Sequence, residues 1–138
     1  MQEQKLILNP QEIASLGASL RKIEQKLLKQ KHTEGKQKIW FQGEEPYFDV
    51  FFELEHDELI WFQLTLRGKS VSWDRQKQQL QTGMTNELSI YDASFYAASK
   101  TIENDIKTDN EFIDLVKSIL GTRSEEAIFA KALELFNL

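Results

Sequence analysis

Alternation of apolar and polar side chains over residues 47–55 constrains the fold more than any other feature of the sequence. The segment reads YFDVFFELE. One side of an extended chain carries Phe48, Val50, Phe52 and Leu54, and the other carries Tyr47, Asp49, Phe51, Glu53 and Glu55. A period of two is that of a β-strand with one face in a core. The pattern therefore predicts an antiparallel sheet with one apolar face and one mixed face.

The next segment, LIWFQLTLRGKSVSW over residues 59–73, predicts a hairpin. Gly68 suits the first central position of a type II′ two-residue turn. That turn places Val71 opposite Leu66 and Trp73 opposite Leu64.

The preceding connection fixes the other register. A three-residue loop at 56–58 places Phe52 opposite Phe62, Val50 opposite Leu64 and Leu54 opposite Ile60, and a one-residue slip would move every apolar side chain to the wrong side.

This register leaves the mixed face as the predicted contact surface. Trp61 is expected there, and Trp40 and Trp73 are expected in the core. Large aromatic residues beside arginine are typical of interface anchors. The candidate binding residues are Trp61, Gln63, Arg67, Tyr47 and Asp49.

Helical periodicity flanks the strands. Residues 11–31, capped by Asn9, place apolar side chains at 3,4 spacing, which predicts a helix that packs on the sheet or forms a short coiled-coil seam. Further elements are predicted as a strand at 37–42, a polar loop at 74–83, an edge strand at 87–91, a helix at 93–103, a helix at 110–120 capped by Asp109 and ended by Gly121, and a last helix that follows a capping box at 122–125 and runs to about Phe136.

Together these elements predict one α+β domain over residues 1–138. It has an N-terminal helix, an antiparallel β-meander of three or four strands, and two or three C-terminal helices packed on one sheet face. The length is that of a single domain.

Composition excludes several classes of protein. The absence of cysteine removes disulfides, thiolate metal sites and cysteine nucleophiles. The sequence has no phosphate-binding glycine loop or zinc-protease motif, and His32 and His56 are expected in solvent, so we predict no catalytic residue, no metal site and no cofactor. A net charge of −5 argues against nucleic acid as a partner. Without a signal or membrane segment, the expected location is the cytoplasm.

Two functions remain open. The first is a non-enzymatic protein-interaction module that uses the mixed face. The second is a small-molecule or hydrolytic site built from Asp49, Glu53, Arg67 and Tyr47 beneath a mobile loop at 76–83.

The C-terminal helices also suggest a homodimer. NEFIDLVKSIL and EEAIFAKALELFNL are apolar on more than one side, which indicates packing partners on more than one side.

Overall fold

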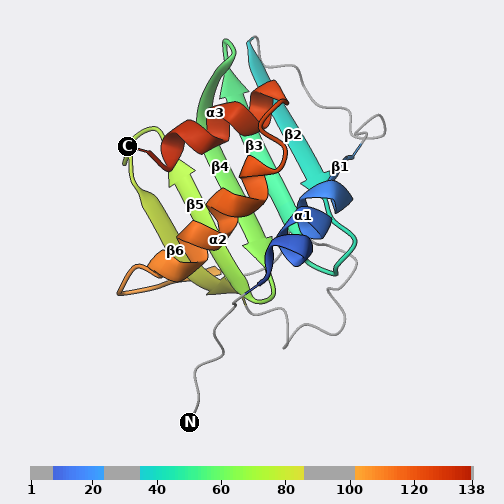
Figure 1. Cartoon of the computed structure of the whole chain (residues 1–138). Coiled ribbons are helices and arrows are strands. Elements are labelled where there is room, and N and C mark those ends of the chain that lie inside the picture. Colours follow the sequence, from blue (N-terminus) through green and yellow to red (C-terminus); the bar gives the residue numbers. More distant parts are fainter. Residues whose placement is uncertain (1–7, 24–34, 86–101, 138) are drawn as a thin grey trace, which may run out of the picture.

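One antiparallel sheet and three helices make up the described part of the chain. The computed structural model describes residues 8–23, 35–85 and 102–137. The sheet has seven strands in the order β1-β2-β3-β4-β5-β6-β7, so each strand pairs with its neighbours along the sequence. All three helices lie over one face of this meander (Figure 1). We call that face the inner face and the opposite one the outer face.

The predicted α+β class is confirmed, with more strands than the three or four expected. The strands are β1 (Arg21–Lys22), β2 (Lys36–Gln42), β3 (Asp49–Glu55), β4 (Glu58–Leu66), β5 (Lys69–Asp74), β6 (Leu80–Thr85) and β7 (Ile102–Asn104). The helices are α1 (Pro10–Ser19), α2 (Asn110–Gly121) and α3 (Ala127–Leu135).

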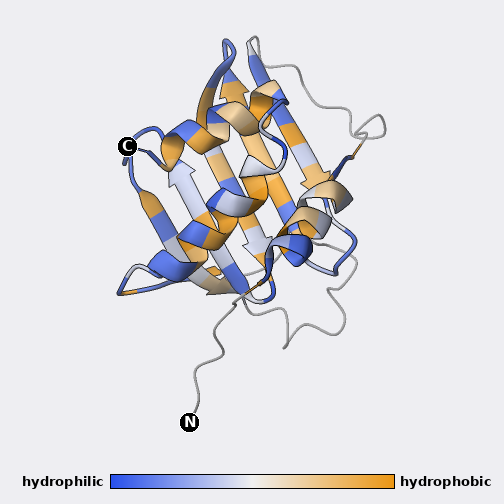
Figure 2. Cartoon of the chain, viewed as in Figure 1, coloured by the Kyte–Doolittle hydropathy of each residue, from blue (hydrophilic) through white to orange (hydrophobic). Residues whose placement is uncertain are grey.

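The core lies between the inner face and the helices. The apolar side chains of β3 enter it as the alternation predicts: Phe48, Val50, Phe52 and Leu54 are all buried. Apolar residues alternate along the strands beneath the helices (Figure 2). Trp73 is also buried there, as predicted, and its indole N–H has no hydrogen-bond partner among the described residues.

The β3–β4 register is confirmed along most of its length. Phe52 pairs with Phe62 and Val50 with Leu64, but the prediction for the hairpin end is wrong because Leu54 pairs with Leu59. His56 and Asp57 both have positive φ, 51° and 66°, which is the requirement of a two-residue type I′ turn. The observed loop is one residue shorter than predicted, and a register shift between Glu53 and Leu54 accommodates the residue that this adds to β4.

The β4–β5 turn also differs from the prediction. Arg67 and Gly68, with φ of 49° and 82°, are its two central residues, so Leu66 pairs with Lys69, Val71 with Leu64 and Trp73 with Phe62. The twist of this turn type matches that of the strands that it joins. The register is displaced by two residues, which leaves every side chain on its predicted face.

The N-terminal helix is shorter than predicted. Helix α1 ends at Ser19, and Leu20 is extended with φ −69° and ψ 122°. Arg21 and Lys22 instead pair with β2 as strand β1. Leu20 enters the core at this bend, so the apolar stripe packs within the chain up to the end of the helix. The rest of the predicted helix, residues 24–31, lies outside the described residues.

The predicted loop at 74–83 is wrong over its second half. Residues Leu80–Thr85 form β6, in which Thr82 pairs with Val71 and is buried. The predicted helix at 93–103 is wrong at its end, because Ile102 and Glu103 belong to β7. The predicted edge strand at 87–91 and residues 93–101 lie outside the described residues.

The helix at 110–120 is confirmed, including its cap, since the Asp109 side chain accepts a hydrogen bond from the N–H of Phe112. Gly121 is its last residue, and Thr122 caps its end by donating to the carbonyl of Ile119 at 2.7 Å. The capping box predicted at 122–125 is therefore wrong. The last helix, α3, has Glu126 as its N-cap, without a side-chain cap bond.

Arg123 joins the first helix to the last two. Its Nη1 donates to the carbonyls of Gly17 and Leu20, both at 2.8 Å, at the end of α1. The guanidinium lies 5.1 Å from the centroid of the Phe129 ring. One side chain thus binds the Leu20 carbonyl and adds a second hydrogen bond to the Gly17 carbonyl, which also accepts from the N–H of Leu20.

Candidate functional site

A row of aromatic rings crosses the outer face. Trp40 and Phe51 are direct partners on β2 and β3, and their ring centroids are 5.6 Å apart with an interplanar angle of 16°. Phe51 and Trp61 follow at 6.4 Å and 40°. Trp40 was predicted in the core and lies instead on this face, because its strand neighbours Ile39 and Phe41 face inward. All three outer rings are only partly buried.

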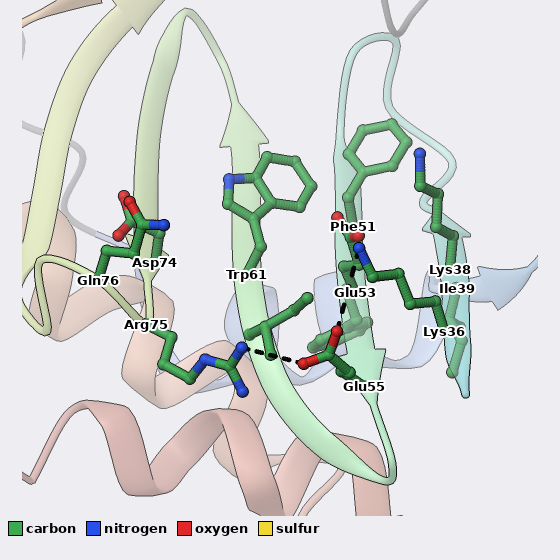
Figure 3. A pocket seen from close by; sticks show the side chains of 12 residues that line it. Lys36, Lys38, Ile39, Phe51, Glu53, Glu55, Trp61, Asp74, Arg75 and Gln76 are labelled. Carbon is green, nitrogen blue, oxygen red and sulfur yellow. Dashed lines mark hydrogen bonds and ion pairs between the residues drawn. The ribbon is translucent and has the colours of Figure 1, made fainter. Parts of the chain in front are cut away.

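A concave region of about 850 Å³ includes the Trp61 end of this row. We call it the outer hollow. Its lining comes from β2, β3, β4, β5 and the turn after β5 (Figure 3). The lining residues are Lys36, Lys38, Ile39, Phe51, Phe52, Glu53, Glu55, Ile60, Trp61, Asp74, Arg75 and Gln76. Three basic and three acidic side chains therefore surround Phe51 and Trp61.

Glu55 holds two of the basic groups. Its Oε1 accepts a hydrogen bond from Arg75 Nη2 at 3.0 Å, and its Oε2 lies 4.0 Å from Lys36 Nζ (Figure 3). The hydrogen bond from Arg75 lowers the pKa of Glu55 below its usual value. The group is exposed, so solvent screens the pairing and it adds little to stability.

Two other carboxylates stand on either side of Trp61. In the sheet register Glu53 on β3 and Asp74 on β5 are the direct partners of Trp61 on β4. Among the side chains that the structure describes, Glu53 forms no ion pair. Asp74 accepts a hydrogen bond at Oδ1 from the N–H of Lys77 at 2.8 Å, which closes the turn after β5.

The predicted contact residues divide between the two ends of the sheet. Trp61 lies in the outer hollow. Gln63 lies two positions along β4 on the same face, opposite Phe51. Arg67 lies six residues from Trp61, about 20 Å along the strand at 3.3 Å per residue. It forms two hydrogen bonds to Glu45, at 3.0 and 2.5 Å, and the bonded carboxylate raises its pKa.

Tyr47 and Asp49 lie at the Arg67 end. Asp49 is fully buried and accepts a hydrogen bond from Trp40 Nε1 at 3.0 Å. Tyr47 has φ of 63° in the turn before β3, and its carbonyl accepts from Thr65 Oγ1 at 2.9 Å. These residues support the β3–β4 ladder from its outer side.

The residues proposed for a hydrolytic site are not gathered at one place. Asp49 and Glu53 are four positions apart on β3, about 13 Å along the strand, with Phe51 between them. Pairs of catalytic carboxylates work at about 5–10 Å across a substrate bond. Arg67 pairs with Glu45. The loop proposed as a cover contains the first residues of β6.

Sequence reasoning missed several residues of the hollow. Phe51 was predicted on the correct face but not as a contact residue. Lys36, Lys38 and Arg75 were not among the candidate binding residues predicted from the sequence, although all four residues line the hollow. The β2–β3 pairing places Trp40 beside Phe51, but the sequence of β2 alone does not indicate which of its side chains face inward.

The helix surface predicted for a dimer is largely used within the chain. The apolar side chains of α2 and α3 that are buried or packed against the core are Phe112, Ile113, Leu115, Val116, Ile119, Leu120, Ile128, Phe129, Ala132, Leu133 and Leu135. The inner face of the sheet, together with the contacts of α2 with α1 and α3, accounts for this packing. The homodimer stays a prediction.

Comparisons with known proteins add no relative: no protein-family model, curated protein or solved structure matches the chain. Within residues 8–23, 35–85 and 102–137, no group of three or more acidic, histidine or cysteine side chains is placed to hold a metal ion. No helix in these ranges has the length and apolar character needed to cross a membrane.

Proposed function

We propose that this chain is a non-enzymatic protein-interaction module and that its contact surface is the outer hollow. The observation that carries the proposal is the position of Trp61, partly exposed in a concave region beside Phe51 and surrounded by charged side chains. A central aromatic residue with a charged rim is the composition of a binding hot spot. The helices cover the inner face (Figure 1), and the hollow is lined by Phe51 and Trp61 of the outer face.

Two further observations favour binding over catalysis. The carboxylates considered for chemistry are about 13 Å apart along β3. Glu55 is held at the rim by Arg75 and Lys36, where it orients these two cations. The ion pairs of Glu55 place charges of both signs at the rim of the hollow, which favours recognition of one partner over another.

The test is a capture experiment with matched variants. Trp61→Ala removes the centre of the hollow, and Arg67→Ala removes an exposed side chain about 20 Å away in the turn that follows β4. We expect Trp61→Ala to reduce capture of a partner by about tenfold or more and Arg67→Ala to change it by less than about twofold. Both variants should keep the far-UV circular dichroism of the wild type. Equal capture by the wild type and Trp61→Ala would refute the proposal.

A small molecule in the hollow is the second candidate, because about 850 Å³ falls within the size range of ligand sites. A thermal-shift screen with metabolites and metals distinguishes it. A rise of several degrees that Trp61→Ala abolishes would assign the hollow to a small ligand.

A second copy of the chain is one form of the proposed partner. Light scattering at tens of micromolar measures this directly. A dimer mass that falls to a monomer mass in Trp61→Ala would identify the hollow as the dimer contact. A monomer mass for the wild type would exclude the homodimer at that concentration.

A further inference from the structure

We propose, on the basis of the function proposed above, that the outer hollow receives a basic side chain of its partner, whose cationic group lies over the Trp61 ring between Glu53 and Asp74.

The register sets the geometry of this site. Glu53, Trp61 and Asp74 lie directly opposite one another on three adjacent strands. Neighbouring strands are about 4.8 Å apart, so the two acidic residues stand about 10 Å apart with the indole midway between them. A cation within about 6 Å of the ring centroid is attracted by the face of the ring and is also near both carboxylates. In Figure 3 the indole of Trp61 lies between Glu53 on β3 and Asp74 on β5.

The charges of these two carboxylates are available to a ligand. Among the acids of the hollow, Glu55 already binds Arg75 and Lys36. Glu53 has no ion pair within the described part of the chain, and Asp74 uses Oδ1 for a backbone N–H. Both side chains are partly buried beside aromatic rings, where solvent screens a charge less than at an open surface. This part of the hollow therefore favours the binding of a positively charged group.

The basic side of the hollow gives the occupant an orientation. Lys38 is the direct partner of Glu53 on β2, on the side away from Trp61, and the two form no ion pair within the described residues. An acidic neighbour of the bound basic residue would meet Lys38 there. The row Lys38, Glu53, Trp61 and Asp74 thus fits a partner segment that carries both signs of charge, with its basic residue over the indole.

The first experiment uses a matched pair of peptides. The probe is acetyl-Gly-Gly-Arg-Gly-Gly-amide, and its control carries citrulline, which keeps the shape of arginine without the charge. Binding is followed by NMR from the indole Nε1–H of Trp61. We expect the arginine peptide to bind about tenfold more tightly than the citrulline peptide. Equal affinity of the two peptides would overturn the proposal.

The second experiment removes the two carboxylates. In Glu53→Gln/Asp74→Asn we expect the affinity for the arginine peptide to fall by about tenfold and its dependence on salt to weaken. The control, Glu111→Gln/Glu125→Gln, makes the same change of charge at exposed positions outside the hollow and should bind within about twofold of the wild type. Wild-type affinity in Glu53→Gln/Asp74→Asn, with unchanged circular dichroism, would refute the role of these residues.

The source of the cation is tested with agmatine, which carries the same guanidinium without a peptide. Agmatine binding as tightly as the arginine peptide would overturn assignment to a partner side chain and favour a small organic cation. The two proposals fail separately. If Trp61→Ala loses capture of the partner but both peptides bind equally, only the proposal of a basic side chain in the hollow is refuted. If Trp61→Ala captures the partner as well as the wild type does, the proposed function is refuted.

Discussion

The two faces of the sheet use aromatic residues for different purposes. Phe52 on the inner face is 1% exposed and has the rings of Phe41, Phe62 and Phe129 within about 6 Å. Its neighbour Phe51 points the other way, is partly exposed, and contacts only the rings of the outer row among the described aromatic residues. One step along a strand thus separates a side chain that holds the fold together from one that forms a surface.

The largest expected effect tests this contrast directly. Phe52→Ala should lower the free energy of unfolding by about 3–5 kcal/mol, since it leaves a cavity among the rings of Phe41, Phe62 and Phe129. Phe51→Ala should cost about 1 kcal/mol or less, because solvent can fill the space. Urea unfolding followed by circular dichroism measures both. Similar losses in the two variants would show that the outer face belongs to the core, and the distinction would fail.

Two arginines extend the comparison to polar contacts. Arg123, with a side chain 19% exposed, donates to two carbonyls at the end of α1, so Arg123→Ala should cost about 2 kcal/mol. Arg123→Lys keeps the charge without the planar donor geometry and should recover only part of the loss. Arg75 on the outer face is 48% exposed, and Arg75→Ala should leave the urea midpoint unchanged. A loss in Arg75→Ala as large as in Arg123→Ala would contradict this ranking.

The alternating pattern was sufficient to predict which residues face the core, because burial depends on the period of two and survives small errors in register. The β4–β5 pairing shows this: the predicted register was wrong by two residues, yet Val71 and Trp73 are buried as expected. The end of α1 could not be predicted, since the apolar spacing continues past Ser19 and tertiary contacts of Leu20 and Arg123 decide where the helix ends.

An intermediate effect concerns the cap that starts α2 beside the inner face. Partial burial acts to raise the pKa of Asp109, but hydrogen bonds from Lys69 and the N–H of Phe112 outweigh it and leave the pKa below its ordinary 3.8. Asp109→Ala should therefore cost about 1 kcal/mol at pH 7.

The direction of this pKa shift predicts how the stability difference between the wild type and Asp109→Ala changes with pH. A carboxylate whose pKa is lowered on folding stabilises the folded state at pH values above its ordinary pKa. This contribution disappears as the pH falls through the lower pKa that the group has in the folded state. Urea midpoints of wild type and Asp109→Ala should differ at pH 7 and converge below about pH 4. A difference that stays constant across this range would show that the carboxylate charge has no role.

The smallest effect is expected at the tip of the β4–β5 hairpin, far from the hollow. Arg67 adopts a positive φ of 49° before Gly68, and asparagine tolerates that backbone better. Arg67→Asn also removes the exposed ion pair with Glu45, which is worth about 0.2–1 kcal/mol. Because the two changes oppose each other, the unfolding free energy should change by less than about 0.5 kcal/mol. A larger loss would place Arg67 among the residues that hold the sheet.

The candidate site was predicted only in part, for a reason that concerns pairing across strands. Trp61 was found because one strand and its neighbour fix its face. The aromatic row needed a third strand, and the sequence of β2 gives little indication of whether Trp40 or its neighbours face inward. Arg67 and Tyr47 were predicted to share a face with Trp61, but both lie in turns beyond the strand ends and far from it along the sheet.

The three tryptophans lie in three different surroundings, and this gives the molecule its own optical reporters. Trp73 is buried in apolar packing, Trp40 donates to a buried carboxylate, and Trp61 borders the hollow. Proteins that keep one indole each, with phenylalanine at the other two positions, would separate the signals. In the folded state, iodide should quench the emission of the protein that keeps Trp61, whereas the emission of the protein that keeps Trp73 should shift to the red only when the chain unfolds.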